Sequence, residues 1–241
     1  MLSSEKDTNF CFPIPDILET DGVRLVPFIP SKHASPLLTG LNNTPDLTQH
    51  VNIGPFTSPS DLVQNFWEKS IKPNPNYTLF VIYDKIASQP PSTDENANAA
   101  GFIALSGCST EHLLAEIGIV TFKAYQGTHV SSHAVGLLMR YALDLPDQGG
   151  LGLRRVQWQT NQVNKASVGL ALKMGFIKEG VLRWHKVLEP GKEIGHNGGK
   201  VRRGDPQEGC GARDTVILAV CWDDWEDGVR KKVERMLSAK R

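Results

Sequence analysis

The chain has 241 residues, of which 40% are hydrophobic and 22% charged, and its 26 Lys and Arg balance 26 Asp and Glu. This length suits one large domain or two small ones, and the balanced charge excludes a protein whose overall field attracts nucleic acid or anionic membranes. The start, Met1-Leu-Ser-Ser-Glu-Lys-Asp, lacks an apolar core, and no apolar run approaches a membrane span. The four cysteines form no CxxC pair, so we expect free thiols and a cytoplasmic protein.

The residues up to 122 predict four strands and two helices. Apolar runs bounded by Pro, Gly and Asn predict strands, which are residues 23–30, 77–83, 102–105 and 115–122. Apolar residues at helical spacing predict helices over 31–43 and 61–71, with Ser31 as N-cap of the first and Ser60 before the second. The polar stretch 85–100, which contains two consecutive prolines, predicts a loop insertion.

The rest of the chain predicts three strands and three helices. The strands are expected at residues 154–160, 177–188 and 215–220, and the helices at 130–145, 164–174 and 222–239. Gly175 is the expected left-handed residue that ends the helix over 164–174. Residues 188–213 hold seven glycines and predict a long loop. Since several strands follow one another without a helix, the order favours an α+β fold and excludes a purely parallel repeat. We expect an arm over 1–20 and a single domain over 21–241 with loop insertions at 85–100 and 188–213.

The most informative segment is 115–133, in which an apolar strand leads through a short turn at Gly127 into a long helix. Such a junction directs unsatisfied backbone N–H groups and the positive end of the helix dipole at one point, which suits an anion. An ordinary strand-to-helix connection would carry the same pattern. Since no GxxxxGK[ST] motif follows, the sequence disfavours a nucleotide triphosphatase.

Two blocks of this chain resemble the GNAT acyltransferases. The first, Glu116-Ile-Gly followed by Tyr125-Gln-Gly-Thr-His-Val-Ser-Ser-His-Ala, is similar to the family's acyl-CoA pyrophosphate loop Gln/Arg-x-x-Gly-x-Gly/Ala, with His129 and Ser131 at the places of the two glycines. The second block comprises residues 155–161, 164–167, 174–176 and 179–183. It resembles the strand–helix–Gly-Phe–strand unit of the RimJ/RimL branch, which acetylates N-termini of ribosomal proteins. The likeness covers about residues 20–222.

The resemblance implies a mixed, mostly antiparallel seven-stranded sheet flanked by helices, with a V-shaped split between strands 4 and 5. It also implies acetyl-CoA, or a close acyl-CoA, as the co-substrate. The pantetheine arm would run along the fourth strand, the pyrophosphate would meet backbone N–H groups of the turn, and Asn164 would bind or orient the pantetheine. The implied cofactor-binding residues are Ile119, Val120, Gln126, Gly127, Thr128, His129, Val130, Ser131 and Asn164.

Acyl transfer to an amine requires a base, an oxyanion donor and an acid for the thiolate. Glu116 is the candidate base because burial beside an apolar strand would raise its pKa; it would otherwise be a structural carboxylate. A backbone N–H near Val120 is the expected oxyanion donor. Ser167 is the candidate acid, matching a serine of the RimL-like branch, or else a serine of the helix surface.

Two departures from the family weaken the catalytic assignment. Many GNAT enzymes have a tyrosine acid four residues before the position of Gly175, where this chain has Ala171. Some RimL-like members have a catalytic glutamate where this chain has Lys186, beside His185.

Other chemistries fit the sequence less well. His129 and His133 are four residues apart and could share a helical face, but no acidic third ligand is legible, so no metal is expected. Cys108 or Cys210 as a thiol nucleophile lies in no known motif.

The preferred function is an acyl-CoA-dependent N-acetyltransferase acting on a primary amine of a small molecule. The alternatives are acetylation of a protein N-terminus and a non-catalytic acyl-CoA-binding module. We expect no nucleic-acid or membrane partner and a monomer or homodimer. Residues 188–213 are expected to form a lid or wall over the acceptor, with Lys200, Arg202 and Arg203 near an anionic part of it, or else a plain surface loop.

Overall fold

The structure is a computed structural model that describes residues 9–43, 45–50, 53–86 and 96–238. Its strands are β1 (Leu18–Glu19), β2 (Val23–Pro27), β3 (Thr78–Asp84), β4 (Ala99–Ser109), β5 (Leu114–Thr121), β6 (Arg155–Asn161), β7 (Ile177–Leu188) and β8 (Gly211–Cys221). Its longer helices are α1 (Pro30–Asn42), α2 (Pro59–Leu62) with its π-helical continuation η2 (Val63–Ile71), α3 (His129–Leu143), α4 (Lys165–Met174) and α6 (Arg230–Ser238). Short helical segments are η1 (Pro45–Thr48), η3 (Lys123–Tyr125), η4 (Pro146–Gln148), η5 (Glu193–Gly195), α5 (Trp222–Asp224) and η6 (Trp225–Val229).

One sheet of eight strands organises the molecule, in the order β1-β2-β3-β4-β5-β6-β8-β7. Only β5 and β6 pair in parallel, and all other neighbours are antiparallel. The expected mixed, mostly antiparallel sheet flanked by helices is therefore confirmed. The sheet has one strand more than expected because the end of the N-terminal arm adds the two-residue β1.

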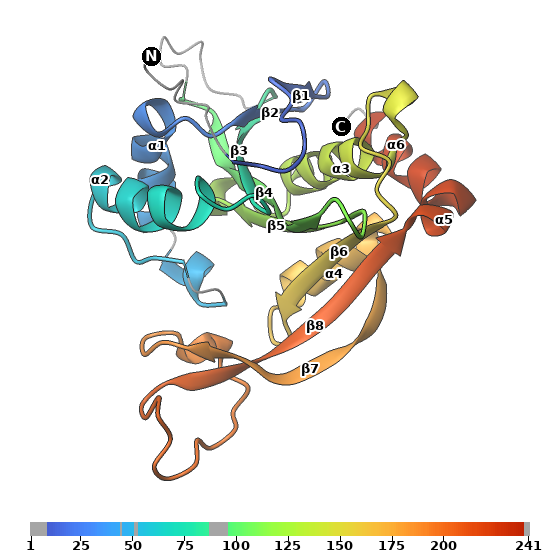
Figure 1. Cartoon of the computed structure of the whole chain (residues 1–241). Coiled ribbons are helices and arrows are strands. Elements are labelled where there is room, and N and C mark those ends of the chain that lie inside the picture. Colours follow the sequence, from blue (N-terminus) through green and yellow to red (C-terminus); the bar gives the residue numbers. More distant parts are fainter. Residues whose placement is uncertain (1–8, 44, 51–52, 87–95, 239–241) are drawn as a thin grey trace.

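The sheet splits between β5 and β6, the fourth and fifth of the expected strands. Their parallel ladder joins only residues 114–116 to residues 155–157. Beyond it β5 continues beside β4, whereas β6 continues beside β8. Figure 1 shows β6, β8 and β7 diverging from the upper half of the sheet. This divergence leaves one side of β5 without a strand neighbour.

Each face of the sheet has its own hydrophobic core. α3 covers one face, and its buried stripe of Val135, Leu138, Met139 and Ala142 is fully inaccessible, as its helical spacing predicts. α1 and the α2–η2 helix cover the other face of the N-terminal half, where Leu62, Phe66, Trp67 and Ile71 pack against α1 and β3 (Figure 1). Large apolar side chains thus fix the sheet between two layers of helices.

Two predicted helix starts are wrong. α1 begins at Pro30 and has no side-chain cap at Ile29, so Ser31 lies inside the helix. The α2–η2 helix begins at Pro59, and Ser58, not Ser60, caps it by accepting a hydrogen bond from the Asp61 backbone N–H. Proline explains both differences, since its fixed φ and missing N–H favour the first helical position.

The loop insertions are shorter than predicted, because the flanking strands are longer. β3 ends at Asp84 and β4 begins at Ala99, and residues 87–95 between them lie outside the described part of the chain. β7 and β8 leave residues 189–210 as their connection. The described part of the arm is attached to the domain, since the Cys11 N–H donates to the carbonyl of Pro75. None of the described helices combines the length and apolarity that a membrane crossing needs.

Candidate active site

A cavity of about 430 Å³ occupies the split between β5 and β6. We call it the cleft. It runs from the turn before α3, along β5 and β6, to the start of β8. The residues that line it are Leu47, His50, residues 117–121, 126–128, 131–132, 158–161, Asn164, Ala166, Ser167, Leu170, Lys173 and Arg213. The cleft therefore joins the predicted anion-binding turn to the opposite end of the sheet.

The turn at one end of the cleft is held open by its backbone. Gly127 has φ +73, a conformation that favours glycine, and a Cβ placed there would meet no atom within 4 Å. The Gln126 side chain donates from Nε2 to the carbonyl of Thr121 at 3.1 Å and so fastens the turn to the end of β5. A flexible anion therefore has space to approach the turn backbone.

The first turn of α3 provides the donors. Thr128 is the N-cap, and its Oγ1 accepts a hydrogen bond from the Val130 N–H. The first four N–H groups of a helix have no intrahelical acceptor, and this cap serves one of them. The Ser131 hydroxyl lies 2.9 Å from that of Thr121, which positions both at the cleft wall. Backbone N–H groups and the helix dipole thus converge here, as anion binding requires.

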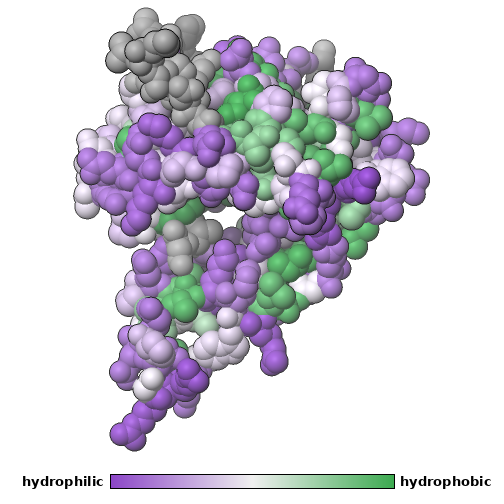
Figure 2. Space-filling model, in the orientation of Figure 1, coloured by the Kyte–Doolittle hydropathy of each residue, from purple (hydrophilic) through white to green (hydrophobic). Residues whose placement is uncertain are grey.

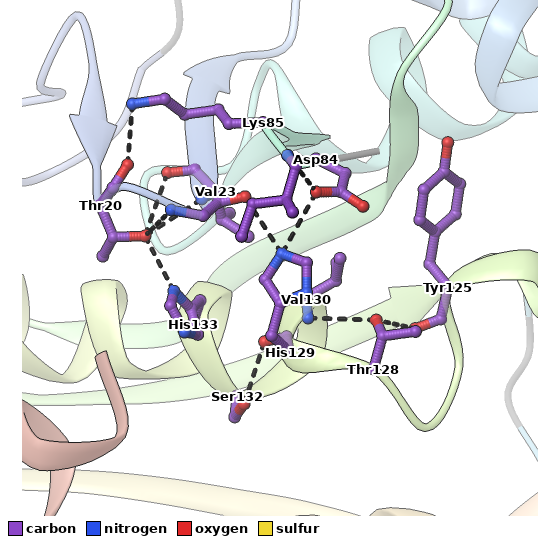
Figure 3. A network of polar contacts seen from close by, with 12 residues as sticks. Thr20, Val23, Asp84, Lys85, Tyr125, Thr128, His129, Val130, Ser132 and His133 are labelled. Atoms are coloured by element: carbon purple, nitrogen blue, oxygen red, sulfur yellow. Dashed lines mark hydrogen bonds and ion pairs between the residues drawn. The ribbon is translucent and has the colours of Figure 1, made fainter. Parts of the chain in front are cut away.

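Two of the predicted cofactor-binding side chains point away from the cleft. Val130 is fully buried in the core. His129 Nε2 lies 3.2 Å from Asp84 Oδ1 and 3.2 Å from the carbonyl of Gly22, as Figure 3 shows. His133 on the next turn lies 2.9 Å from the Thr20 hydroxyl. These residues of α3 therefore reach a ligand in the cleft only through their backbone.

The two histidines also bear on the metal alternative. Each ring has its own partner in the protein, and the two rings meet edge to face at 5.2 Å. In the part of the chain that the structure describes, the group with metal-ligand spacing is Cys221, Asp223 and Asp224. There the Asp224 carboxylate accepts from the Cys221 N–H at 2.9 Å, so it caps α5.

The register of β5 decides which of its backbone groups face the cleft. The Phe122 N–H donates to the carbonyl of Ala100 on β4. Because backbone groups of a strand alternate with a period of two, the N–H of Val120 also points toward β4. The N–H groups of Ile119 and Thr121 point the other way, into the split. A backbone oxyanion donor near Val120 would therefore be the N–H of Ile119 or of Thr121.

Glu116 stands where the split closes, one residue before the first β5 residue that lines the cleft. Gln157 donates from Nε2 to its Oε2 at 3.4 Å. Burial raises the pKa of Glu116 to about 7, although nearby Lys186, this hydrogen bond and Arg213 act to lower it. A carboxyl with that pKa is divided between its two protonation states near neutral pH, as a general base requires.

Ser167 lies on the first turn of α4 and lines the cleft. Trp158 on β6 donates from its indole Nε1 to the Ser167 Oγ at 3.0 Å. The Ser167 hydroxyl accepts this bond, so its own hydrogen can point elsewhere. Asn164 is the N-cap of α4 and accepts from the Ser167 N–H at 3.1 Å through Oδ1, which leaves its amide N–H groups for a ligand.

Several cleft residues were not predicted from the sequence. His50, Trp158 and Arg213 line the cleft and come from three distant segments, and Gln157 bonds to Glu116. Gln157 and Trp158 lie in the block that resembles the RimJ/RimL branch, but the resemblance assigns them no role, and no motif marks His50 or Arg213. Ala171 is fully buried, so no polar group replaces the family tyrosine at that position. Cys108 is also buried, which raises the pKa of its thiol to about 12 and disfavours a thiolate nucleophile.

The β7–β8 connection is docked on the segment that follows α1. Gln49 donates from its side chain to the carbonyl of Gly191 at 2.9 Å, and Lys192 donates to the carbonyl of Thr48 at 3.3 Å. Asn161, which lines the cleft, donates to the carbonyl of Gly195 at 2.7 Å. The first part of this connection is therefore docked against Asn161 and the segment next to His50, two residues that line the Arg213 end of the cleft. The side chain of Arg202 in its outer part is 80% exposed and lies 3.6 Å from Asp205. Figure 2 shows that the outer tip of this connection, at the bottom of the view, is mostly hydrophilic.

Residues 23–177 match the family described as acetyltransferase (GNAT) domain. With the split sheet and the turn before α3, this match shows that the chain belongs to the GNAT acetyltransferases. It is therefore an enzyme that transfers acetyl groups, with acetyl-CoA as its co-substrate. The open space at Gly127 and the donors at the start of α3 fit the pyrophosphate of that molecule.

Individual relatives have low sequence identity to this chain. The chain is 28% identical over 142 residues to an uncharacterized N-acetyltransferase p20 of Bacillus licheniformis. The aligned part is 58% of this chain and 71% of that protein. A GCN5-related N-acetyltransferase from Brucella melitensis has a similar structure, with a TM-score of 0.71 at 22% identity over 94% of this chain and 87% of that one. Mycobacterium smegmatis RimJ in complex with CoA-disulfide has a TM-score of 0.63 at 12% identity, covering 94% of this chain and 95% of that one.

Proposed function

We propose that this enzyme transfers the acetyl group of acetyl-CoA to a primary amine of a small molecule, with Glu116 as general base and Ser167 as general acid. The observation that carries the proposal is the cleft itself. It joins the turn before α3 at one end to Arg213 at the other, near Glu116. The acetyl donor and the amine can thus enter from opposite ends and meet between β5 and β6.

The pyrophosphate would bind at residues 126–131, with the pantetheine along Ile119 and Val120 and past Asn164. Since β5 has no strand neighbour on this side, its free backbone groups can hydrogen bond with the pantetheine amides as a neighbouring strand would. Ile119 and Thr121 supply N–H groups in that direction. One of them would also stabilise the negative charge that develops on the thioester oxygen.

The chemical step needs a neutral amine. In our proposal Glu116, directly or through one water molecule, takes a proton from the ammonium group. The amine nitrogen then attacks the thioester carbon, a C–N bond forms, and the C–S bond breaks, while the second proton of the nitrogen is lost to solvent as the amide forms. The Ser167 hydroxyl donates its hydrogen to the departing thiolate, and its oxygen keeps the hydrogen bond from Trp158 Nε1. Products are the amide and CoA, and the serine regains a proton from solvent.

Acetylation of a protein N-terminus is the second candidate, since RimJ shares the fold. The docked β7–β8 connection favours a small acceptor, because it is attached to Asn161 and to the segment before His50, beside the end of the cleft that an extended peptide would have to cross. A cytoplasmic location agrees with four cysteines that are all free.

A test measures CoA release with acetyl-CoA and a panel of primary amines, and identifies acetylated products by mass spectrometry. A parallel arm uses short peptides with free N-termini. We expect the small amines to give the higher kcat/KM. Preference for the peptides would replace the small-molecule proposal with the second candidate. Release of CoA only by hydrolysis in both arms would contradict both.

A further inference from the structure

Arg213 is a buried cation at the end of the cleft that the acetyl donor does not need. It lies at the start of β8, opposite Lys186 of β7 in the sheet register, and its side chain lines the cleft. Only 5% of the residue is exposed. An arginine this buried usually has a carboxylate beside it, because an uncompensated charge in the interior costs several kcal/mol.

No such carboxylate is present among the described residues, none of which places an acidic oxygen within 4 Å of this guanidinium. Arg213 donates from Nε to the Thr215 hydroxyl at 3.0 Å and from Nη1 to the carbonyl of His50 at 3.0 Å. Both acceptors are neutral. They fix the plane of the guanidinium and use two of its five N–H groups. The other N–H groups stay available for a ligand in the cleft.

The surroundings of Arg213 hold more positive than negative charge. Glu116 is the acid that acts on it electrostatically, and Lys186 lies near both. Partial burial lowers the pKa of His185, and the same two cations lower it further. Two cations therefore face one carboxyl group, and that carboxyl group is only partly ionised near neutral pH.

The excess of positive charge near Arg213 favours some amine acceptors over others. A polyamine would bring further positive charge to an end of the cleft that already has an excess of it. An ammonium group that carries its own carboxylate brings no net charge. A planar guanidinium with its orientation fixed is suited to a carboxylate, which can accept two parallel N–H bonds from it.

We propose that the acceptor is a primary amine that also carries a carboxylate, that Arg213 binds this carboxylate, and that the amine is thereby directed toward Glu116. This inference rests on the proposed function and adds the chemical class of the acceptor. The same chemistry occurs in a free amino acid and at the end of an acidic peptide, so the experiment includes both.

Binding is measured first, because it does not depend on turnover. Saturation-transfer NMR on the CoA-loaded protein uses three sets of probes: the L-amino acids, the matching amino acid amides, and dipeptides with an acidic second residue. We expect amino acids to bind and their amides, which lack the carboxylate, to bind at least about 10-fold more weakly. Binding of the acidic dipeptides but not of the amino acids would assign the carboxylate to a peptide.

Three variants distinguish the charge of Arg213 from the hydrogen bonds that hold its guanidinium in place. Arg213→Gln should weaken carboxylate binding by about 10- to 100-fold, the usual loss when a hydrogen bond to a charged group is removed. Thr215→Val removes one support of the guanidinium but keeps its charge, so it should have a much smaller effect. Arg183→Gln, an arginine of exposed β7 outside the cleft, is the matched control and should leave binding unchanged.

The inference is overturned if amides bind as well as amino acids, if Arg213→Gln leaves carboxylate binding intact, or if no probe with a carboxylate binds. Turnover of the same panel then tests the proposed function separately. Arg213-dependent binding without acetylation would keep the carboxylate site and reject the proposed reaction. Acetylation of amides or polyamines at a rate independent of Arg213 would keep the reaction and reject the carboxylate site.

Discussion

Glu116 and Gln157 form the last pair of the parallel ladder between β5 and β6, and the Gln157 amide donates to the Glu116 carboxylate at 3.4 Å. Past this pair the two strands separate and the cleft begins. The carboxyl group therefore stands at the closed end of the split with a neutral partner rather than a bonded cation. Burial consequently has the largest effect on its pKa.

Replacing this carboxyl group tests the proposed base. Glu116→Gln should lower kcat by about 10²–10⁴-fold, the usual range for a general base, while acetyl-CoA affinity stays nearly unchanged. In the wild type kcat/KM should rise with pH through about 7, as Glu116 loses its proton, and this rise should be absent from the variant. Steady-state kinetics from pH 5 to 9 and calorimetric titration with acetyl-CoA measure both. A variant that is as fast as the wild type at every pH would leave solvent or His185 as the proton acceptor.

The same pKa predicts how stability depends on pH. In the folded protein Glu116 titrates at about 7, against 4.5 for the ordinary carboxyl group, so the folded state holds its proton more tightly. This tighter proton binding adds about 3 kcal/mol at most to the free energy of unfolding. The added stability is fully present below about pH 4.5 and is lost as the pH rises through about 7. Relative to the wild type, Glu116→Gln should therefore be more stable at pH 8 than at pH 4. Urea unfolding at the two pH values measures this, and an equal difference at both would show that the pKa is not raised.

A side chain at Gly127 tests the anion-binding turn. Gly127→Val should weaken acetyl-CoA binding by about 10-fold or more, the worth of one hydrogen bond to a charged group, because the side chain occupies the space before the turn backbone. Positive φ makes the substitution strained by about 1–2 kcal/mol. Gly149→Val is the matched control, since Gly149 has φ +85, equally open surroundings and a place outside the cleft. Equal acetyl-CoA affinity in the two variants would contradict the placement.

The Trp158–Ser167 bond allows the proposed acid to be tested apart from its structural role. Ser167→Ala should lower kcat by about 10²-fold, the low end for a general acid, and should also cost about 1–3 kcal/mol of stability, because the Trp158 N–H loses its acceptor. Trp158→Phe removes the donor but keeps the hydroxyl, so it should affect stability more than kcat. If both variants lower kcat equally, the serine serves only to hold β6 on α4.

The β7–β8 connection is proposed to be a wall of the acceptor site rather than a plain surface loop. Replacing residues 191–209 with a short Gly-Ser linker removes the docked part as well as the outer part, and should raise acceptor KM by about 10-fold while acetyl-CoA affinity holds. Replacing only residues 200–208 should leave KM unchanged, because the hydrogen bonds from Gln49 and Asn161 are made to Gly191 and Gly195. An unaltered KM in the longer deletion would show a loop without a role in acceptor binding.

Local patterns in the sequence were sufficient to predict most helices and strands and the turn at one end of the cleft. Strand and helix periodicities are properties of neighbouring residues, so the sheet strands and the α3 stripe of Val135 to Ala142 could be predicted. The turn at Gly127 could be predicted for the same reason, because its glycine and the helix that follows are adjacent in the chain. Two helices begin one or two residues earlier than predicted, because a proline occupies the first helical position of each.

The other end of the cleft was decided by tertiary structure. Gln157 meets Glu116 through the β5–β6 ladder, and Arg213 meets His50 because the start of β8 lies beside the segment that follows η1. The pKa of Glu116 depends on burial and on Lys186, Gln157 and Arg213, and Arg213 is held by His50, which is 163 residues away in the chain. By itself the sequence indicated the family and its acetyl donor, because the blocks that resemble the family are each made of residues close together in the chain. The proposed acceptor site is built from distant segments, and only their packing brings its charges together.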